Sequence, residues 1–382
     1  MNKRQLVYIL GLIGVMVLLG AGCGGDEDSS SDNGSDGSYP AEFNEMVDNA
    51  MAPVSEWPGP TSSPKLKPNQ LVFSIPCSKV AEGCEFINQG VKDAAEAVGW
   101  DYKTVDPEGS PEKSNAAIRQ AVQANADVIV MVAIDPKVVS DALGDAQDAG
   151  IPVVLVAGGR EGEPELLANN GVFTDVTFRS YELGELLGAF IAVNSDGEAK
   201  VAMFNTPEWP TIDQRFEGTK ASLSECPGCE VVAETDFAQT EIGTTLGSKY
   251  QSVLQANPDA DYAWVGLDAA ASVLVAANQQ AGSDQAQITS IDGNKQNIDY
   301  VMDGSQLVTI GSPLNWTGWA ALDEANRAVN GAEPATDNIP YRLITKENAE
   351  QFVGTGFEGD IDYQAKYLQL WKTGKTSKSV DK

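Results

Sequence analysis

Histidine is absent from this chain of 382 residues, and its absence excludes several kinds of chemistry. Histidine is the commonest general base in enzymes, the commonest zinc ligand and the base of Ser-His and Cys-His catalytic arrangements. The chain also contains no P-loop, no G-x-S-x-G sequence and no EF-hand loop, and Gly158-Gly159 does not complete a dinucleotide fingerprint. We therefore expect a protein that is not an enzyme and that holds no cofactor or metal.

Positive charge is scarce. Lysine and arginine number 25 against 55 aspartates and glutamates, which makes the formal net charge −30. So large an excess of negative charge disfavours nucleic acids and anionic membrane surfaces as partners. Hydrophobic residues make up 42% and charged residues 21%, as in ordinary globular proteins. Pairs of carboxylates arise by number alone in such a chain, so they give no specific support to a glycosidase.

Long hydrophobic runs are lacking too, because the apolar stretch from Leu6 to Leu19 is too short to span a bilayer comfortably. It follows Lys3 and Arg4 and leads through Gly22 to Cys23, which is typical of an export signal. The junction is similar to a bacterial lipobox, although Gly20 stands where leucine is usual. We predict a signal peptide over residues 1–22 and a lipid on Cys23, which anchors the protein to the outer face of the cytoplasmic membrane. A plain secretory signal with a chance cysteine and an N-terminal anchor helix stay open as alternatives.

Cysteines are few, and apart from Cys23 they number four: Cys77, Cys84, Cys226 and Cys229. An even number outside the membrane indicates disulfides, and three connectivities are possible. We favour the local pairs Cys77–Cys84 and Cys226–Cys229. The second pair also has the C-x-x-C form of a redox motif or of half a zinc site. It lies after a helical segment and before a strand, whereas a redox motif opens a helix after a strand.

The chain is expected to begin with a tether and Pro-rich linker over residues 23–70, with one short helix at 41–52. From Leu71 onward, apolar runs rich in β-branched residues alternate with amphipathic helical patterns, which predicts parallel sheets covered on both faces. The expected strands are 71–75, 128–134, 153–157, 201–205, 231–235, 262–267, 288–292 and 307–311. The expected helices are 86–98, 111–124, 137–149, 181–193, 214–223, 244–256, 269–281 and 318–329. A lone extended segment at 172–175 separates two similar α/β halves, each a doubly wound sheet, and a helical tail ends the chain.

Ligands of open parallel sheets bind outside the carboxyl ends of the strands, so the loops there are the candidate site. These loops hold the aromatic residues Trp209, Phe237, Trp316 and Trp319, and the carboxylates Asp213, Asp236, Asp268 and Asp292. Aromatic faces and carboxylates together suit a polyhydroxy ligand, whose CH groups lie on rings and whose hydroxyls donate to carboxylates. The alternative is that the tryptophans pack the rim and the aspartates cap helices.

Short segments in a specific order resemble those of a known family. They are Gly90-Val91-Lys92-Asp93-Ala94-Ala95, Ala126-Asp127-Val128-Ile129-Val130, Ala149-Gly150-Ile151-Pro152-Val153-Val154, Arg215-Phe216-Glu217-Gly218, Asn257-Pro258-Asp259, Ile291-Asp292-Gly293 and Thr345-Lys346-Glu347-Asn348. The chain resembles the type 1 periplasmic binding proteins, in particular the ribose-binding-like solute receptors of ABC transporters. The resemblance implies two lobes that close over a ligand about a three-strand hinge. The first lobe would comprise 71–174 plus 313–340, and the second 175–312 plus 341–382 with the C-terminal tail.

The resemblance also implies ligand-binding positions, and these match the family in part. Leu267 replaces an Asn of the usual Asn-Asp pair, Ala157-Gly158 replaces an Asp-Arg pair, and the Cys77–Cys84 loop replaces an aromatic pair. These departures speak against a simple aldopentose. The candidate ligand-binding residues are Phe86, Asp135, Trp209, Asp213, Arg215, Phe237, Asp268, Asp292 and Trp316.

The sequence thus favours a solute-binding receptor of an ABC importer, which captures a sugar or a similar polar molecule between two lobes. Its partners would be that ligand, a permease and the membrane that holds its lipid, and we expect a monomer that binds no nucleic acid. A ligand-sensing component of a membrane receptor is one alternative. An exported carbohydrate-active enzyme is another.

Cys23→Ser tests the lipid anchor directly. Without the thiol there is no site for the lipid, so the variant should appear in the medium or remain unprocessed. Metabolic labelling with a fatty acid and cell fractionation measure both outcomes. Unchanged labelling and membrane retention in the variant would contradict the assignment.

Overall fold

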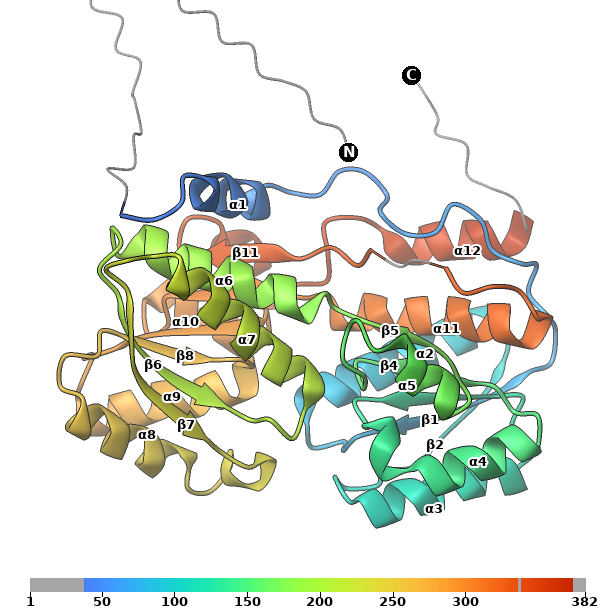
Figure 1. Cartoon of the computed structure of the whole chain (residues 1–382). Helices are drawn as coiled ribbons and strands as arrows, with labels where there is room; N and C mark the ends of the chain where they lie inside the picture. Colours follow the sequence, from blue (N-terminus) through green and yellow to red (C-terminus); the bar gives the residue numbers. More distant parts are fainter. Residues whose placement is uncertain (1–37, 336–337, 374–382) are drawn as a thin grey trace, which may run out of the picture. The chain divides into compact units, whose positions relative to one another are not determined.

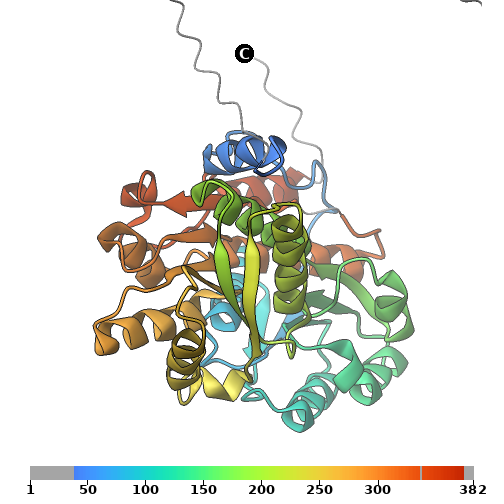
Figure 2. The same ribbon diagram turned by 60° about the vertical axis from the view of Figure 1, so that its left-hand side comes forward.

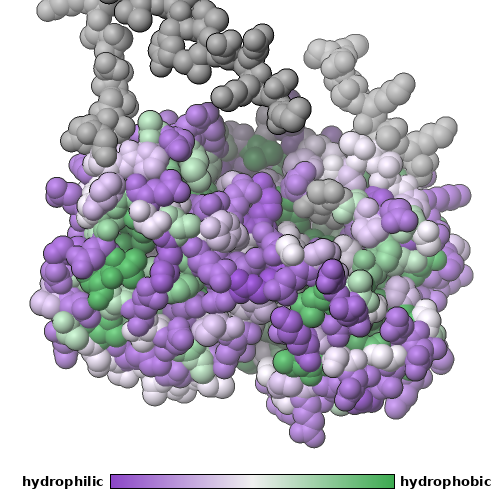
Figure 3. Space-filling view, in the orientation of Figure 1, coloured by the Kyte–Doolittle hydropathy of each residue, from purple (hydrophilic) through white to green (hydrophobic). Residues whose placement is uncertain are grey.

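A computed structural model of the protein describes residues 38–335 and 338–373, which form two α/β lobes (Figure 1). The predicted signal peptide and Cys23 lie outside the described residues. Within the described part of the chain, no helix has the length and apolar character that crossing a membrane requires. The face drawn in Figure 3 is covered mostly by hydrophilic residues, as the acidic composition leads one to expect.

The first lobe is built on a five-stranded sheet of order β2-β1-β3-β4-β5, in which every pairing is parallel. Its strands are β1 (Leu71–Pro76), β2 (Asp101–Thr104), β3 (Val128–Val132), β4 (Val153–Val156) and β5 (Val172–Val176). The helices between them are α2 (Glu82–Val98), α3 (Pro111–Gln123), the short η1 (Pro136–Val138), α4 (Ser140–Asp148) and α5 (Pro164–Asn169). Ser110 caps α3, because its side chain accepts a hydrogen bond from the N–H of Lys113. Pro111 occupies the first position of the helix.

The second lobe has a six-stranded sheet of order β11-β10-β9-β8-β6-β7, and β11 is antiparallel to β10. Its strands are β6 (Lys200–Asn205), β7 (Glu230–Asp236), β8 (Tyr262–Val265), β9 (Gln287–Asp292), β10 (Val308–Gly311) and β11 (Arg342–Thr345). Its helical segments are α6 (Ser180–Asn194), α7 (Pro210–Ser224), η2 (Gln239–Glu241), α8 (Leu246–Ala256), α9 (Asp268–Ala281), α10 (Lys295–Asp303) and η3 (Ala349–Phe352). The eight predicted strands are all present within these two sheets.

The apolar pattern did not indicate three of these elements. Strand β2 is an edge strand of alternating exposed and half-buried residues, so it shows no apolar run. Helix α5 buries no side chain and therefore has no apolar stripe, and α10 is short. The segment expected to be a lone extended piece is β5, which closes the edge of the first sheet beside β4.

The chain passes between the lobes after β5, after β10 and after α11 (Leu314–Asn330), and these three passages agree with a three-strand hinge. A further passage after β11 leads to α12 (Tyr363–Thr373). Helix α11 follows the second-lobe strand β10 but packs on α2 and on the first sheet. The sulfur atoms of Cys77 and Cys84 lie 2.12 Å apart, and those of Cys226 and Cys229 lie 2.11 Å apart, which is bonding distance in both cases.

The N-terminal segment from residue 39 to 70, which we call the strap, packs on both lobes. Its helix α1 (Glu42–Met51) lies against α6 and β11 of the second lobe (Figures 1 and 2). Further along, Ser63 Oγ donates to Asp323 Oδ1 at 2.5 Å, and Pro64 O accepts from Asn326 Nδ2 at 2.9 Å, both on α11 of the first lobe. The expected extended linker is therefore part of the packed structure.

The C-terminal tail corrects one expectation, because we assigned it to the second lobe and it packs on the first. Helix α12 (Tyr363–Thr373) lies against α11. Trp371 stacks on Trp319 with ring centroids 5.6 Å apart, and its indole N–H donates to Asp323 at 2.6 Å. After β11 the chain leaves the second lobe. The aromatic side chains of α12 then pack on α11 of the first lobe.

Glycines bring one pair of helices in each lobe into backbone contact. A Cβ on Gly218 of α7 would lie 2.1 Å from the carbonyl oxygen of Tyr181, and one on Gly184 of α6 would lie 2.1 Å from that of Arg215. In the first lobe, a Cβ on Gly90 of α2 would lie 2.3 Å from the carbonyl oxygen of Asn315. No larger residue fits at these crossings without moving a helix.

Gly218→Ala is expected to lower the free energy of unfolding by about 1–3 kcal/mol or more, because the new methyl forces α6 and α7 apart. Chemical denaturation measures this loss. Gly144→Ala is the matched control, since a Cβ at that position on α4 meets nothing within 4 Å. It should instead stabilise the protein by about 0.5–1 kcal/mol. Equal effects of the two substitutions would refute the close crossing.

Candidate functional site

A cavity of about 370 Å³ lies where the carboxyl ends of the two sheets face each other. Its lining residues follow β1, β3 and β4 in the first lobe and β6, β7, β8 and β9 in the second. The volume falls within the range of small-molecule sites, and the carboxyl edge is where open parallel sheets bind ligands. The cavity is therefore the candidate binding site.

A buried ion pair forms the polar centre of the second-lobe wall. Arg215 Nη1 on α7 lies 2.9 Å from Asp292 Oδ1 at the end of β9, and the two side chains are 3% and 14% exposed. The same nitrogen donates to Gly266 O at 2.7 Å. Among the described residues, the buried Nε of Arg215 has no hydrogen-bond partner. Burial raises the pKa of Asp292, and the neighbouring guanidinium opposes that shift.

A second carboxylate, Asp268 at the start of α9, lies beneath this pair and is fully buried. It accepts hydrogen bonds from the Ser290 hydroxyl, from Thr309 Oγ1 at 2.8 Å and from the N–H of Asn294 at 2.7 Å. Its own N–H points at Asp292 Oδ2 from 3.3 Å. Burial raises the pKa of Asp268 to about 7, and the charge of Asp292 acts in the same direction. Asp268 thus holds the loop after β9 in place and does not line the cavity.

Polar contacts join the two lobes around the cavity. Glu82 Oε2 at the start of α2 accepts from Asn294 Nδ2 at 3.0 Å. Burial, followed by the charge of Asp292, raises the pKa of Glu82. Beside the cavity, Arg160 Nη1 of the first lobe pairs with Asp213 of the second at 2.7 Å. The lobes are therefore in contact in this structure, with the cavity between them.

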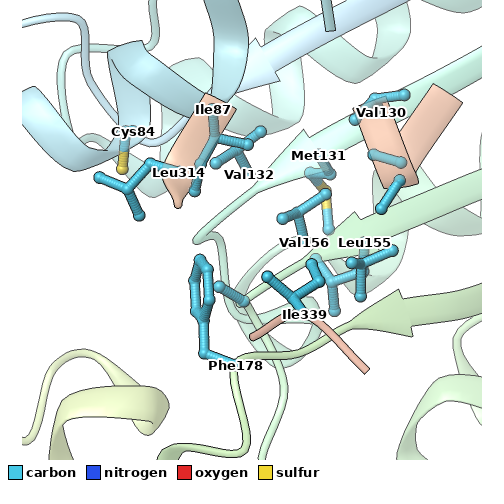
Figure 4. Packing of buried hydrophobic residues seen from close by; sticks show 14 of the residues in the cluster. Cys84, Ile87, Val130, Met131, Val132, Leu155, Val156, Phe178, Leu314 and Ile339 are labelled. Atoms are coloured by element: carbon cyan, nitrogen blue, oxygen red, sulfur yellow. The ribbon is translucent and has the colours of Figure 1, made fainter. Parts of the chain in front are cut away.

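The remaining lining is mostly apolar. Figure 4 shows Phe178 across an open space from Leu314, Ile87 and Cys84, all of which line the cavity. Trp209 and Leu267 contribute apolar surface from the second lobe. A ligand in this cavity would lose most of its water.

The backbone around the cavity is strained. Ala133 and Ala157, which follow β3 and β4, have φ angles of 51° and 53°, and Asp292 has a φ of 142°. Residues other than glycine rarely adopt these conformations, and such strain concentrates at functional sites. Three lining residues share this backbone strain, which supports the assignment of the site.

Of the residues proposed from the sequence, Trp209, Arg215 and Asp292 line the cavity together. Asp268 supports them from below. Asp213 lies beside the cavity in its ion pair with Arg160. The structure brings these five side chains to one region of the second lobe, on or next to the ends of β6, β8 and β9.

Four other proposed residues lie outside the cavity lining, and the packing and capping alternative accounts for Trp316 and Asp135. Phe237 is 3% exposed and belongs to the apolar core of the second lobe. Trp316 is 1% exposed and stacks between Trp57 and Tyr363 at 5.4 and 5.0 Å. Asp135 caps η1 by accepting from the N–H of Lys137. Phe86 is not a lining residue, although Cys84 and Ile87 of the same helix are.

Helix geometry is the reason for two of these differences. Trp316 lies two residues beyond the lining residue Leu314 on α11, and two residues of helix rotate a side chain by about 200°. It therefore faces the strap and α12. Phe86 precedes Ile87 on α2, so it is turned by about 100° from the cavity-facing side. A position after a strand is not enough to place a side chain in the site.

Sequence reasoning did not single out Glu82, Asn294, Phe178 or Leu314. The loops that hold Glu82, Asn294 and Leu314 are among those expected at the site, because they follow β1, β9 and β10. The two apolar side chains themselves gave no signal, since nothing in the sequence distinguishes a cavity wall from a core. No group of three or more Cys, Asp or Glu side chains within residues 38–335 and 338–373 is placed to hold a metal ion.

Comparison with known proteins agrees with this architecture. The sequence profile of the family described as periplasmic binding protein domain matches residues 72–333. The chain belongs to this family. It is 23% identical over 264 residues to the ribose import binding protein RbsB of Bacillus subtilis (strain 168), covering 68% of this chain and 82% of that protein. It is 24% identical over 278 residues to a D-apiose import binding protein of Actinobacillus succinogenes, covering 72% of this chain and 79% of that protein.

Solved structures share the fold of this periplasmic binding protein. An ABC transporter periplasmic solute binding protein from Actinobacillus succinogenes 130z, with bound D-allose, superposes with a TM-score of 0.66 at 20% identity. The match covers 74% of this chain and 99% of that one. A solute binding protein from Bacillus halodurans C-125 with bound myo-inositol gives 0.65 at 20% identity, over 77% and 98% of the two chains. The fold is that of the type 1 periplasmic binding proteins.

The raised pKa of Asp268 predicts a pH dependence of stability. An unfolded aspartate is ionised above about pH 4, whereas the buried carboxyl keeps its proton up to about pH 7. The folded state therefore binds more protons in this range, and the free energy of unfolding falls as the pH rises. We expect Asp268→Asn to remove about 2 kcal/mol of this fall between about pH 5 and about pH 7.

Denaturation curves of wild type and Asp268→Asn across this pH range measure the difference. The amide suits the site because the Oδ1 partners, Ser290 and Thr309, are hydroxyls that also accept hydrogen bonds. Asp148→Asn on the exposed surface of α4 controls for the loss of one negative charge. A pH dependence in Asp268→Asn equal to that of the wild type would show that the assigned proton is absent.

Proposed function

We propose that this protein is the solute-binding receptor of an ABC importer and that its ligand is a hydroxylated small molecule of the sugar and polyol class. The observation that carries the proposal is the buried Arg215–Asp292 pair in a cavity between two hinged lobes. The relatives named for ribose and D-apiose import support it. So do the solved neighbours with bound D-allose and myo-inositol.

The pair suits neighbouring hydroxyl groups. Asp292 accepts a hydrogen bond from one hydroxyl, and the guanidinium of Arg215, which lines the cavity beside it, donates to another. Charged groups make the stronger hydrogen bonds, and a site closed to water strengthens them further. A ligand without hydroxyls would leave both charged groups poorly paired. The site thus selects for hydroxyls and does no chemistry on them.

Closure of the lobes would complete the site. Glu82 and Asn294 come from different lobes and meet at the cavity, and Arg160 and Asp213 meet beside it. In an open form these contacts would be lost and the cavity exposed to water. Ligand binding would favour the closed form by contacting both walls. The permease would recognise that form.

A ligand-sensing component for a membrane receptor would use the same binding step. A permease and an ATPase encoded next to this protein would favour the importer. An exported carbohydrate-active enzyme has less support, since Asp292 is held in an ion pair and Glu82 is engaged by Asn294. Recovery of unchanged ligand after long incubation would separate the receptor from the enzyme.

We further propose that the protein is exported by its signal peptide and anchored through Cys23, as a monomer. The acidic, serine-rich stretch after Cys23 would separate the lobes from the membrane. The pairs Cys77–Cys84 and Cys226–Cys229 would be disulfides in that oxidising location. The first of these would shape the loop that precedes α2 at the cavity.

Asp292→Asn tests the binding site. The amide keeps the size of the side chain but loses the charge that accepts a ligand hydroxyl. Affinity should fall by about tenfold to a hundredfold, which corresponds to about 1–3 kcal/mol. Titration calorimetry with ribose, apiose, allose and myo-inositol measures the loss. Small-angle scattering should show that the ligand compacts the wild type.

Asp284→Asn is the matched control, because Asp284 is exposed and lies between α9 and β9, at the opposite end of the sheet from the cavity. It should bind like the wild type. Unchanged affinity in Asp292→Asn, together with no compaction by ligand, would refute the site and the receptor mechanism.

A further inference from the structure

The two walls of the cavity differ in chemistry. Five polar side chains line it from the second lobe, and they include Arg215, Asp292 and Asn294. Among the described residues of the first lobe, Glu82 is the one polar side chain in the lining. The rest of that wall is hydrocarbon or small, and it includes Ile87, Leu314, Ala133 and Ala157, with Phe178 at the connection between the lobes.

The polar group on the first-lobe wall is already engaged. Glu82 accepts from Asn294 of the opposite lobe at 3.0 Å, so its carboxylate faces the polar corner near Asp292. A ligand hydroxyl directed at Ile87, Leu314 or Phe178 would therefore meet no side-chain partner. A buried hydroxyl without a partner lowers affinity by about ten- to a hundredfold. A free sugar can turn one CH face toward this wall, but any hydroxyl that points there finds no side-chain partner.

The charges at the site add a second constraint. Two carboxylates, Glu82 and Asp292, face the single guanidinium of Arg215 in the lining. An anionic ligand, such as a sugar phosphate or a uronate, would meet net negative charge in a buried space. The ligand is therefore neutral in its hydroxylated part.

We infer that the ligand is a neutral sugar carrying a hydrocarbon substituent, of the class of alkyl and aryl glycosides. Its hydroxylated ring lies on the second-lobe wall against Arg215 and Asp292. Its hydrocarbon part lies on the first-lobe wall between Phe178 and Leu314 (Figure 4). This inference rests on the proposed function and names the substrate class of the same site.

The expected gain follows from burial. Each methylene taken out of water strengthens binding by about fourfold. A phenyl or hexyl group held between Phe178, Ile87 and Leu314 should therefore raise affinity at least tenfold over the parent sugar. A methyl group should give a smaller increase in the same direction.

Titration calorimetry on the full mature protein tests this with matched sets of probes. Each set contains a free sugar (glucose, galactose, xylose or ribose), its methyl β-glycoside, its phenyl β-glycoside and its hexyl β-glycoside. We expect at least one set in which affinity rises from the free sugar to the phenyl or hexyl glycoside by tenfold or more. If the free sugar binds as tightly as its glycosides in every set that binds, the inference is overturned and the proposed function stands.

Leu314→Asn locates the hydrocarbon. It should lower the affinity for the glycoside about tenfold more than the affinity for the parent sugar. Val138→Asn is the control, because Val138 is 48% exposed on η1 and does not line the cavity. It should keep both affinities. If a folded Leu314→Asn variant loses the same factor of affinity for the parent sugar and for the glycoside, the hydrocarbon substituent does not lie on the first-lobe wall.

The wild-type comparison decides the inference without any variant, so it does not depend on Leu314→Asn folding. Leu314→Ala provides a second measurement, since it removes apolar surface without adding a polar group and should reduce the glycoside advantage in part. If no probe in any set binds, the proposed sugar ligand is wrong and the inference fails with it. Equal affinities for free sugars and their glycosides would be a different result. It would overturn the inference about the hydrocarbon substituent and leave the proposed function standing.

Discussion

The close crossing of helices at glycines is the constraint on which the rest of the structure depends. In each lobe, the helix that follows the first strand of that lobe's sheet meets a second helix backbone to backbone, at Gly90 and Gly318 in one lobe and at Gly184 and Gly218 in the other. Helices this close cannot slide or rotate independently, because their carbonyl oxygens occupy the place where side chains would be. Each crossing thereby fixes the relative position of its two helices.

This constraint also positions the site. Arg215 lies on α7 one turn before Gly218, and its own carbonyl oxygen is in the contact with Gly184. Leu314 begins α11, and the next residue, Asn315, contacts Gly90. One side chain on each wall of the cavity is therefore set by the same kind of crossing. Binding groups on such rigid elements need little reordering when a ligand arrives.

Buried polar groups then hold the loops to these rigid elements. Asp268 gathers hydrogen bonds from β9, β10 and the loop after β9, and so fixes the backbone around Asp292. On the first lobe, Asp323 plays a comparable part for the chain ends. It accepts from Ser63 of the strap, from Trp371 of α12 and from Arg327 at 2.8 Å. The segment that leads from the predicted anchor is thus tied into the folded body before β1 begins.

The sequence by itself determined the two-lobed α/β fold, because buried parallel strands must be apolar on both faces and their helices amphipathic on one. It also indicated Arg215, Asp292 and Trp209, since these residues follow strands whose carboxyl ends meet at one edge. It did not place Trp316, Phe237 or Phe86, because the direction of a side chain depends on helix rotation and on partners distant in sequence. Only the tertiary structure decided that the strap and α12 pack on α11, and that one wall of the cavity is apolar. Both depend on which surfaces meet across the lobes, and a pattern local to one element carries no information about its partner.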